Sequence, residues 1–218
     1  MKEILNKNQI AVLDKIKGSD FITKSFYLTG GTALAAFYLS HRYSEDLDFF
    51  SEKEFDISNL DVFFNQIKRD LVIKKIDFQQ SYNRNLFFLY FKDEVLKIEF
   101  TFFPFPRIEQ GEKKAGLIID SILDIGVNKL FTIYQRTMAR DFIDLFFICR
   151  KKGYSVNDLI KKARLKFDWH IDLLQLGSQF IKATEAEDYP RMIKQIEPRE
   201  WRDFFIKEAK RLKPEVLE

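Results

Sequence analysis

The 218-residue sequence lacks most of the features that mark secreted, membrane-spanning or strongly nucleic-acid-binding proteins. It has one cysteine, Cys149, which excludes an internal disulfide and, inside an apolar run, indicates a buried structural thiol. The formal net charge is only +3, so total charge makes no case for nucleic-acid binding. No stretch approaches transmembrane length, and the N-terminus has no apolar signal core. We therefore expect a cytoplasmic protein with no membrane segment.

Hydrophobic and aromatic side chains, in contrast, are abundant. They make up 46% of the chain, and 24 residues are Phe, which predicts a packed globular protein. The length suits one domain, or one domain with a helical addition.

The most informative stretch covers residues 26–50. Its pattern predicts a short apolar strand, a turn at Gly30 and Gly31, a helix, a polar loop and a second strand carrying Asp46 and Asp48. Strand side chains two apart share a face, so the two carboxylates repel each other unless a cation lies between them. The glycine turn and helix start suit an anion. The stretch predicts a site for a nucleoside triphosphate with magnesium; the alternative is an ordinary turn before a solvated strand edge.

Further along, helix and strand patterns alternate. The predicted elements are helices over residues 3–18 and 58–71, strands over 72–80, 85–91 and 95–103, a polar loop over 107–114, and helices over 121–137, 156–166, 169–182 and 200–212. A short polar turn joins the last two strands and predicts an antiparallel hairpin. The expected fold is α+β, with a mixed sheet and flanking helices over residues 1–115 and a helical bundle over 116–218.

Glu99 is the candidate for a third carboxylate. The run over residues 95–103 alternates, so Glu99 and Lys97 lie on its polar face. We expect Glu99 to lie beside Asp46 and Asp48, because three carboxylates on neighbouring strands suit two-metal nucleotidyl transfer. The alternative is a surface Glu paired with a Lys across the strands.

A second charged block follows over residues 120–148. Lys129 lies on a predicted helix, and Asp141 and Asp144, three residues apart, meet on one helix face. A lysine held against a carboxylate stays charged and correctly aimed, which suits a triphosphate. Either carboxylate fits this role, and the other is free to pair with a neighbouring arginine.

Together these blocks resemble the AbiEii/AbiGii-type nucleotidyltransferase toxins, a branch of the polymerase-β-like nucleotidyltransferase superfamily. The resemblance covers about residues 26–148, in the right order. It is carried by Gly-Gly-Thr-Ala-Leu at 30–34, His-Arg-x-Ser-x-Asp-Leu-Asp-Phe at 41–49, the block from Asp120 through Lys129, and Arg-Asp-x-x-Asp at 140–144.

The resemblance implies a nucleotidyltransferase-like core followed by a helical domain that completes the nucleotide cleft. It also implies a two-metal Mg²⁺ site, with Lys129 on the nucleotide phosphates. The family's third carboxylate is often Asp, so Glu99, one methylene longer, departs from the pattern. The predicted residues are Asp46, Asp48 and Glu99 for metal, Gly30, Gly31, Thr32 and Lys129 for the nucleotide, and Asp48, Glu99, Lys129, Asp141 and Asp144 for catalysis.

The implied reaction moves a nucleoside monophosphate from an NTP to an acceptor hydroxyl and releases pyrophosphate. The resemblance further implies the toxin of a toxin–antitoxin system of phage-defence type, an RNA acceptor such as tRNA, and a separately encoded antitoxin. A basic stretch over residues 151–166 either meets RNA phosphates or is a solvated surface. Other readings are a small-molecule (antibiotic-type) transferase, a metal-dependent nuclease, or a catalytically silent binding module.

Overall fold

The structure, a computed structural model, describes residues 4–216 and the side chains of residues 4–212. The chain divides into two compact units, each described here by itself. The sheet unit comprises Met1–Tyr38, Tyr43–Pro106 and Gln110–Ser121, and the helical unit comprises Leu39–Arg42, Arg107–Glu109 and Ile122–Glu218.

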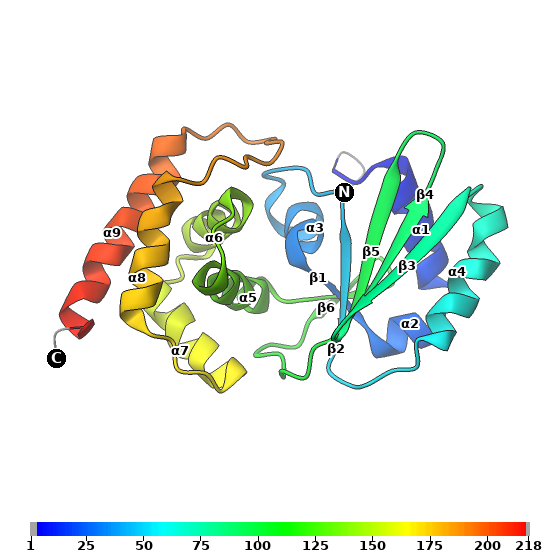
Figure 1. The fold of residues 1–218 in the computed structure, drawn as a ribbon, viewed down its shortest axis with the longest axis horizontal. Helices are drawn as coiled ribbons and strands as arrows, with labels where there is room; N and C mark the ends of the chain where they lie inside the picture. The colour runs from blue at the N-terminus through cyan, green and yellow to red at the C-terminus, as the bar shows by residue number, and fades with distance from the viewer. Residues whose placement is uncertain (1–3, 217–218) are drawn as a thin grey trace. The chain divides into compact units, whose positions relative to one another are not determined.

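The sheet unit is built on a seven-stranded mixed sheet with the strand order β3-β4-β5-β2-β1-β7-β6 (Figure 1). The β2–β5 and β1–β7 pairs are parallel, and the other neighbouring pairs are antiparallel. The strands are β1 (Tyr27–Thr29), β2 (Leu47–Ser51), β3 (Lys75–Ser81), β4 (Arg84–Tyr90), β5 (Val95–Phe102), β6 (Glu112–Lys114) and β7 (Leu117–Ile119). The expected mixed sheet is confirmed, including the antiparallel β4–β5 hairpin.

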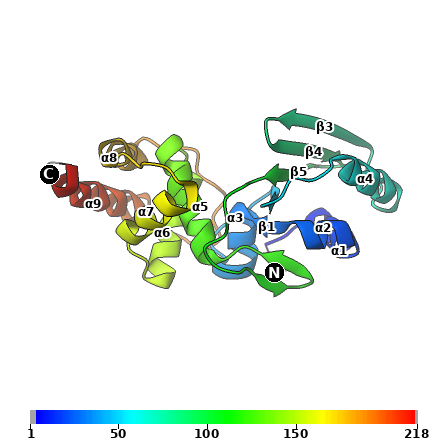
Figure 2. The same cartoon turned by 90° about the horizontal axis from the view of Figure 1, so that it is seen from below.

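Helices cover one side of the β3–β4–β5 layer (Figure 2). The helices of this unit are α1 (Lys7–Lys17), α2 (Asp20–Ser25), α3 (Gly30–Leu34) and α4 (Ser58–Asp70). Phe64 of α4 packs against Phe87 of β4 at a ring separation of 4.4 Å and also contacts Phe100 of β5. Side chains alternate between the two faces of a strand, so the face of β5 opposite these phenylalanines is available for charged residues.

Two short features of the sheet unit were not predicted. The predicted polar loop over residues 107–114 contains β6, which forms a hairpin with β7 through Ala115 and Gly116, both at positive φ. Helix α2 has only six residues. Elements this short contain too few residues for a hydrophobic period to be recognised. Residue 3, where the first helix was predicted to begin, lies outside the described residues, and α1 begins at Lys7.

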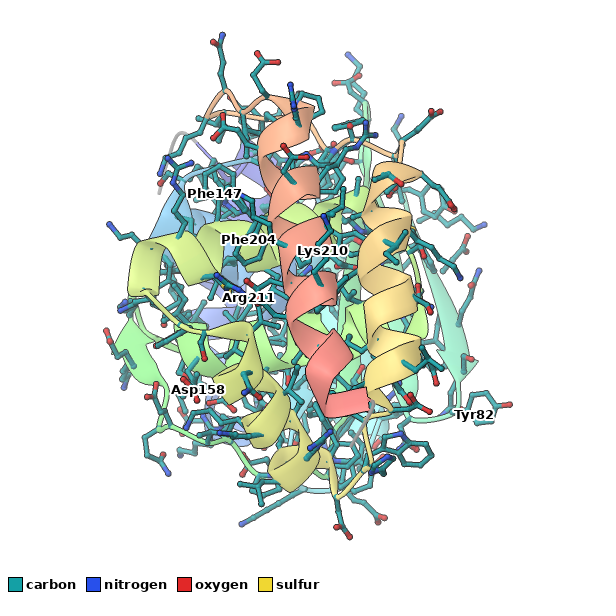
Figure 3. The ribbon with its side chains drawn as sticks, turned by 90° about the vertical axis from the view of Figure 1, so that its left-hand side faces the viewer. Tyr82, Phe147, Asp158, Phe204, Lys210 and Arg211 are labelled. Carbon is teal, nitrogen blue, oxygen red and sulfur yellow. The ribbon has the colours of Figure 1, made fainter. Side chains whose placement is uncertain are left out.

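The helical unit is a bundle, as expected. Its helices are α5 (Ile122–Gln135), α6 (Ala139–Lys152), α7 (Val156–Phe167), α8 (Leu173–Ile181), the 3₁₀ turn η2 (Lys182–Thr184) and α9 (Pro198–Val216). Helices α8 and α9 lie side by side (Figure 3). In the core of the bundle, Phe142 of α6 contacts Phe205 of α9, with ring centroids 4.9 Å apart. Phe205 also contacts Phe180 of α8.

Between residues 35 and 39 the helix that follows the glycine turn changes to a π-helix, η1 (Ala35–Leu39). The predicted boundary between residues 115 and 116 falls at the β6–β7 turn, and the sheet unit continues to Ser121. Across the part of the chain that is described, no helix has both the length and the apolarity of a membrane span.

Candidate active site

The predicted site residues form two groups, one in each unit. In the sheet unit, the parallel register of β2 and β5 places Asp48 directly beside Glu99. The sequence predicted both aspartates within the strand, but β2 begins at Leu47, so Asp46 lies just before it; its carboxylate contacts Lys97 of β5. The expectation that strand periodicity brings acidic side chains of two strands onto one face is met.

Asp46 is held by a lysine of the neighbouring strand. Lys97 Nζ lies 2.7 Å from Asp46 Oδ2, and about a third of the Asp46 side chain (34%) and a quarter of the Lys97 side chain (26%) remain exposed. The contact is a single ion pair that solvent reaches. An exposed pair of this kind is weak, because water screens it.

Glu99 is held far more firmly. Arg84 of β4 donates from Nε to Oε1 at 2.7 Å and from Nη2 to Oε2 at 2.6 Å, and the Thr101 hydroxyl donates to Oε1 at 2.8 Å. Burial raises the pKa of the Glu99 carboxyl, but the bonds from Arg84 and Thr101 outweigh it and hold this pKa below its usual value. The cross-strand pairing considered from the sequence is present with Arg84 as partner, and metal ligation by Glu99 stays a prediction.

The glycine turn lies against Asp48. Gly30 has φ +72°, and a Cβ built on it would lie 2.5 Å from Asp48 Oδ2. The absence of a side chain at Gly30 therefore leaves room at this carboxylate oxygen. Gly31 and Thr32 are buried in α3, and the Thr32 hydroxyl donates to the backbone carbonyl of Asp46. Thr32 thus fixes the chain just before β2, and its phosphate contact stays a prediction.

The sheet-unit group fits a magnesium ion in its chemistry. Asp46 and Asp48 are oxygen donors on one face, and the space that a Cβ at Gly30 would fill lies beside one of them. Within residues 4–216, no three or more His, Cys, Asp or Glu side chains are already grouped to hold a metal. Asp46 and Asp48, with Gly30 beside Asp48, are therefore the core of the candidate metal site.

The second group lies in the helical unit around Asp144 of α6, whose side chain is fully buried. His41 Nε2 lies 2.7 Å from Asp144 Oδ1, and Arg42 donates to both oxygens, at 2.6 and 2.8 Å. Lys129 Nζ of α5 lies 2.7 Å from Asp144 Oδ2. This one carboxylate joins the segment at 39–42 to two helices.

Asp141, one turn earlier on α6, completes the arrangement. Lys129 Nζ donates to Asp141 Oδ1 at 2.7 Å, and Arg136 donates to Asp141 Oδ2 at 2.9 and 3.1 Å. Both predicted aspartates therefore contact Lys129, and Asp141 also takes the arginine partner that the sequence offered. A lysine held by two carboxylates is fixed in direction and keeps its charge.

The electrostatics of this group follow from burial and pairing. Burial raises the pKa of Asp144, but Lys129, Arg42 and His41 outweigh it and hold this pKa well below its usual value. Burial lowers the pKa of His41 more than Asp144 raises it. His41 is therefore a neutral donor to Asp144 near pH 7, while Asp144 is charged.

Comparison with known proteins gives the family. The model of the nucleotidyl transferase AbiEii toxin family, described as a type IV toxin–antitoxin system, matches residues 17–210. The chain belongs to this family. The AbiEii resemblance drawn from the motifs is confirmed, and with it nucleotidyltransferase activity and a nucleoside triphosphate substrate. As a toxin of a toxin–antitoxin system, the family implies an antitoxin partner.

Relatives of this AbiEii chain are found in sequence and in structure. The protein aq_aa25 of Aquifex aeolicus is 31% identical over 212 residues, which cover 94% of this chain and 96% of that protein. JHP933 from Helicobacter pylori has a TM-score of 0.62 at 20% identity, covering 99% of this chain and 94% of that one. The nucleotidyltransferase toxin MenT4 from Mycobacterium tuberculosis has a TM-score of 0.52 at 14% identity, covering 94% and 84%. At these identities the two structures support the fold.

Several residues of the AbiEii chain that shape the two groups were not assigned roles from the sequence. Arg84 and Lys97 hold carboxylates in the sheet unit, and Arg42 holds one in the helical unit. Arg42 stands in the quoted His-Arg motif, which was the available signal. The partners of Arg84 and Lys97 depend on strand register, and a local sequence pattern does not specify that register.

The basic stretch over residues 151–166 is not a uniform surface. Lys151 and Lys161 are exposed, whereas Lys166 is buried and lies 2.7 Å from the buried Asp124 of α5. Asp124 also accepts backbone N–H groups from residues 108 and 109, so this pair is structural. Cys149 is buried as expected, and burial raises the pKa of its thiol to about 12, which makes it unreactive at neutral pH.

Proposed function

We propose that this AbiEii protein is a magnesium-dependent nucleotidyltransferase that modifies an RNA hydroxyl, with tRNA as the acceptor class. The observation that carries the proposal is that Asp48 lies beside Glu99 of β5 and Asp46, two residues earlier, contacts Lys97 of the same strand. Gly30 is kept free of a side chain beside Asp48 Oδ2. Two carboxylates in that position suit a divalent cation that accompanies a triphosphate.

Each residue group has a role in this reaction. Asp46 and Asp48 hold the cation, Glu99 is the candidate third carboxylate, and the glycine turn receives phosphate through its backbone. Bound magnesium would neutralise the triphosphate and lower the pKa of the attacking hydroxyl. The acceptor oxygen bonds to the α-phosphorus, the bond from that phosphorus to the pyrophosphate oxygen breaks, and the hydroxyl proton passes to a carboxylate of this group.

Lys129 is the residue that neutralises the triphosphate from the helical unit. Its ammonium donates to Asp141 Oδ1 at 2.7 Å and forms an ion pair with Asp144 Oδ2 at 2.7 Å. These two contacts fix the position of the ammonium. In this proposal Asp141 and Asp144 are positioning residues for Lys129.

The RNA acceptor and the toxin–antitoxin setting rest on family membership and on the exposed Lys161 of α7. A toxin of a toxin–antitoxin pair acts on a cellular target and is countered by its antitoxin. Exposed Lys161 offers phosphate contacts to a nucleic acid, although charge alone identifies no acceptor.

The decisive experiment is incubation of the purified protein with each of the four α-labelled NTPs, Mg²⁺ and total RNA. We expect label in RNA with one or two of the NTPs, loss of labelling in EDTA, and a loss of at least about 1000-fold in Asp48→Asn. The control is Glu52→Gln, which removes an acidic group from the exposed residue that follows β2. This variant should label RNA like the wild type.

Three results would contradict this proposal. Labelling of a small hydroxyl acceptor instead of RNA favours the small-molecule transferase. RNA cleavage without NTP favours a nuclease, since carboxylates and a lysine also serve phosphodiester hydrolysis. Unchanged RNA labelling in Asp48→Asn removes the assigned metal site.

A further inference from the structure

Two carboxylates of the sheet-unit group, Asp46 and Glu99, already have cationic partners, and those partners differ in kind. Glu99 is bound through both oxygens by Arg84 and also by Thr101. Asp46 has a single partially exposed contact with Lys97. A cation entering this face therefore meets one locked carboxylate and one loosely held one.

Lys97 lies where it would compete with a metal ion for the Asp46 carboxylate. Its ammonium lies 2.7 Å from Asp46 Oδ2 and acts electrostatically on Glu99, so it lies within the acidic group. A metal bound to Asp46 through that oxygen would lie within a few ångströms of the ammonium, and two cations at that distance repel each other. The metal and Lys97 therefore compete for Asp46 Oδ2.

We propose that Lys97 is a displaceable counter-ion of Asp46: it occupies the carboxylate before the metal binds, and then moves to the nucleotide phosphates. The inference rests on the proposed function, because it takes Asp46 and Asp48 as the metal site. Lysine suits the exchange, since its flexible stem carries a point charge with three donors. Arg84, held by two parallel bonds, does not move.

The exchange couples metal and nucleotide binding. Without nucleotide, the metal must displace Lys97 into solvent, which weakens its binding. With nucleotide, Lys97 gains phosphate oxygens as new partners, so the metal meets less competition. By linkage, nucleotide raises metal affinity and metal raises nucleotide affinity by the same factor.

The test measures Mn²⁺ binding by electron paramagnetic resonance, with and without α,β-methylene NTP analogues that cannot transfer. For Lys97→Met we expect Mn²⁺ to bind about tenfold tighter than in the wild type without nucleotide. We also expect the enhancement of Mn²⁺ binding by nucleotide to fall about tenfold. Lys97→Arg, which keeps the charge, should bind Mn²⁺ no tighter than the wild type.

Two controls separate competition at Asp46 from a general change of charge. Lys75→Met removes a lysine paired with Asp77 at 2.8 Å on β3 of the same sheet, and should change Mn²⁺ affinity less than about twofold. In a double-mutant cycle, Lys97→Met should lose its effect when Asp46 is replaced by Asn. Unchanged or weaker Mn²⁺ binding in Lys97→Met, or a gain that survives in the Asp46→Asn background, overturns the inference.

Asp48→Asn distinguishes failure of this inference from failure of the proposed function. If Asp48→Asn abolishes Mn²⁺ binding and Lys97→Met leaves it unchanged, the metal site stands and the role of Lys97 falls. If Asp48→Asn binds Mn²⁺ like the wild type, the metal site falls, and the inference falls with it.

Discussion

Asp144 is the residue through which the charged group of the helical unit is held together. Its two oxygens accept bonds from His41, Arg42 and Lys129, and its side chain has no exposed surface. A buried charge is tolerated only when its partners replace water, and removing one partner of such a pair costs about 3–5 kcal/mol. The positions of Lys129 and Arg42 are therefore fixed by one carboxylate.

His41 gives this group a measurable pH dependence. Burial keeps the pKa of His41 below its unfolded value of about 6.5, even though Asp144 opposes that shift and the nearby Arg42 and Lys129 favour it. Between that value and the lowered folded pKa, the unfolded chain binds a proton that the folded protein does not. The free energy of unfolding should therefore fall as pH drops from about 7 to 5.5, by up to about 1.4 kcal/mol per pH unit.

Urea unfolding across this pH range checks the prediction, and the second histidine supplies the control. His41→Gln keeps an N–H for Asp144 but cannot titrate, so its free energy of unfolding should lose most of the wild-type slope. His170→Gln changes an exposed residue and should keep that slope. A wild-type slope in His41→Gln would assign the pH dependence to other groups.

At the scale of elements, the start of α3 and the start of β2 are built against each other. Gly30 has φ +72°, and its missing side chain makes room for the Asp48 carboxylate. Replacing it with Ala places a Cβ in a left-handed conformation, at about 1–2 kcal/mol, and against the carboxylate as well. We expect Gly30→Ala to lower the free energy of unfolding by about 1–3 kcal/mol.

Gly177 is the matched control for this change. It lies inside α8, and a Cβ there meets nothing within 4 Å. Gly177→Ala should raise the free energy of unfolding by about 0.5–1 kcal/mol, because alanine loses less backbone entropy in a helix. Urea unfolding of the two variants should give shifts of opposite sign. A shared sign would show that Gly30 is not constrained by Asp48.

The sequence predicts those elements whose pattern is local. The long strands over 84–90 and 95–102 alternate clearly, and β2 carries Asp48 as predicted, although it begins one residue after Asp46. The three-residue strands β6 and β7 show no period and were missed. The contacts of Lys97 and Arg84 require the parallel β2–β5 and antiparallel β4–β5 registers, and these follow from the packing of the whole sheet.

The same limit applies across longer separations. Arg42 and Asp144 are 102 residues apart, and only the folded helical unit brings them together. The Arg-Asp-x-x-Asp motif indicated two aspartates on one helix face, yet it did not indicate that both contact Lys129. Local chemistry was thus predictable, whereas the choice of partner was set by tertiary structure.

At the scale of the whole molecule, the proposed function assigns nucleotide binding to Asp48 of the sheet unit and to Lys129 of the helical unit. If both residues contribute, the free energy of nucleotide binding depends on each of them, and loss of either one weakens binding. Ligand that binds only the folded protein at 100 times its Kd adds about 2.7 kcal/mol to the free energy of unfolding. For a chain of this length, that raises Tm by about 5–10 °C.

Thermal unfolding with Mg²⁺ and a non-transferable NTP analogue tests this dependence. The wild type should show the rise in Tm, and both Asp48→Asn in the sheet unit and Lys129→Met in the helical unit should lose most of it. Lys24→Met, which removes an exposed ion pair with Asp20, should keep the full rise. Loss in Asp48→Asn alone would confine nucleotide binding to the sheet unit. Lys129 would then act only within the helical unit, and its assignment to the triphosphate would be wrong.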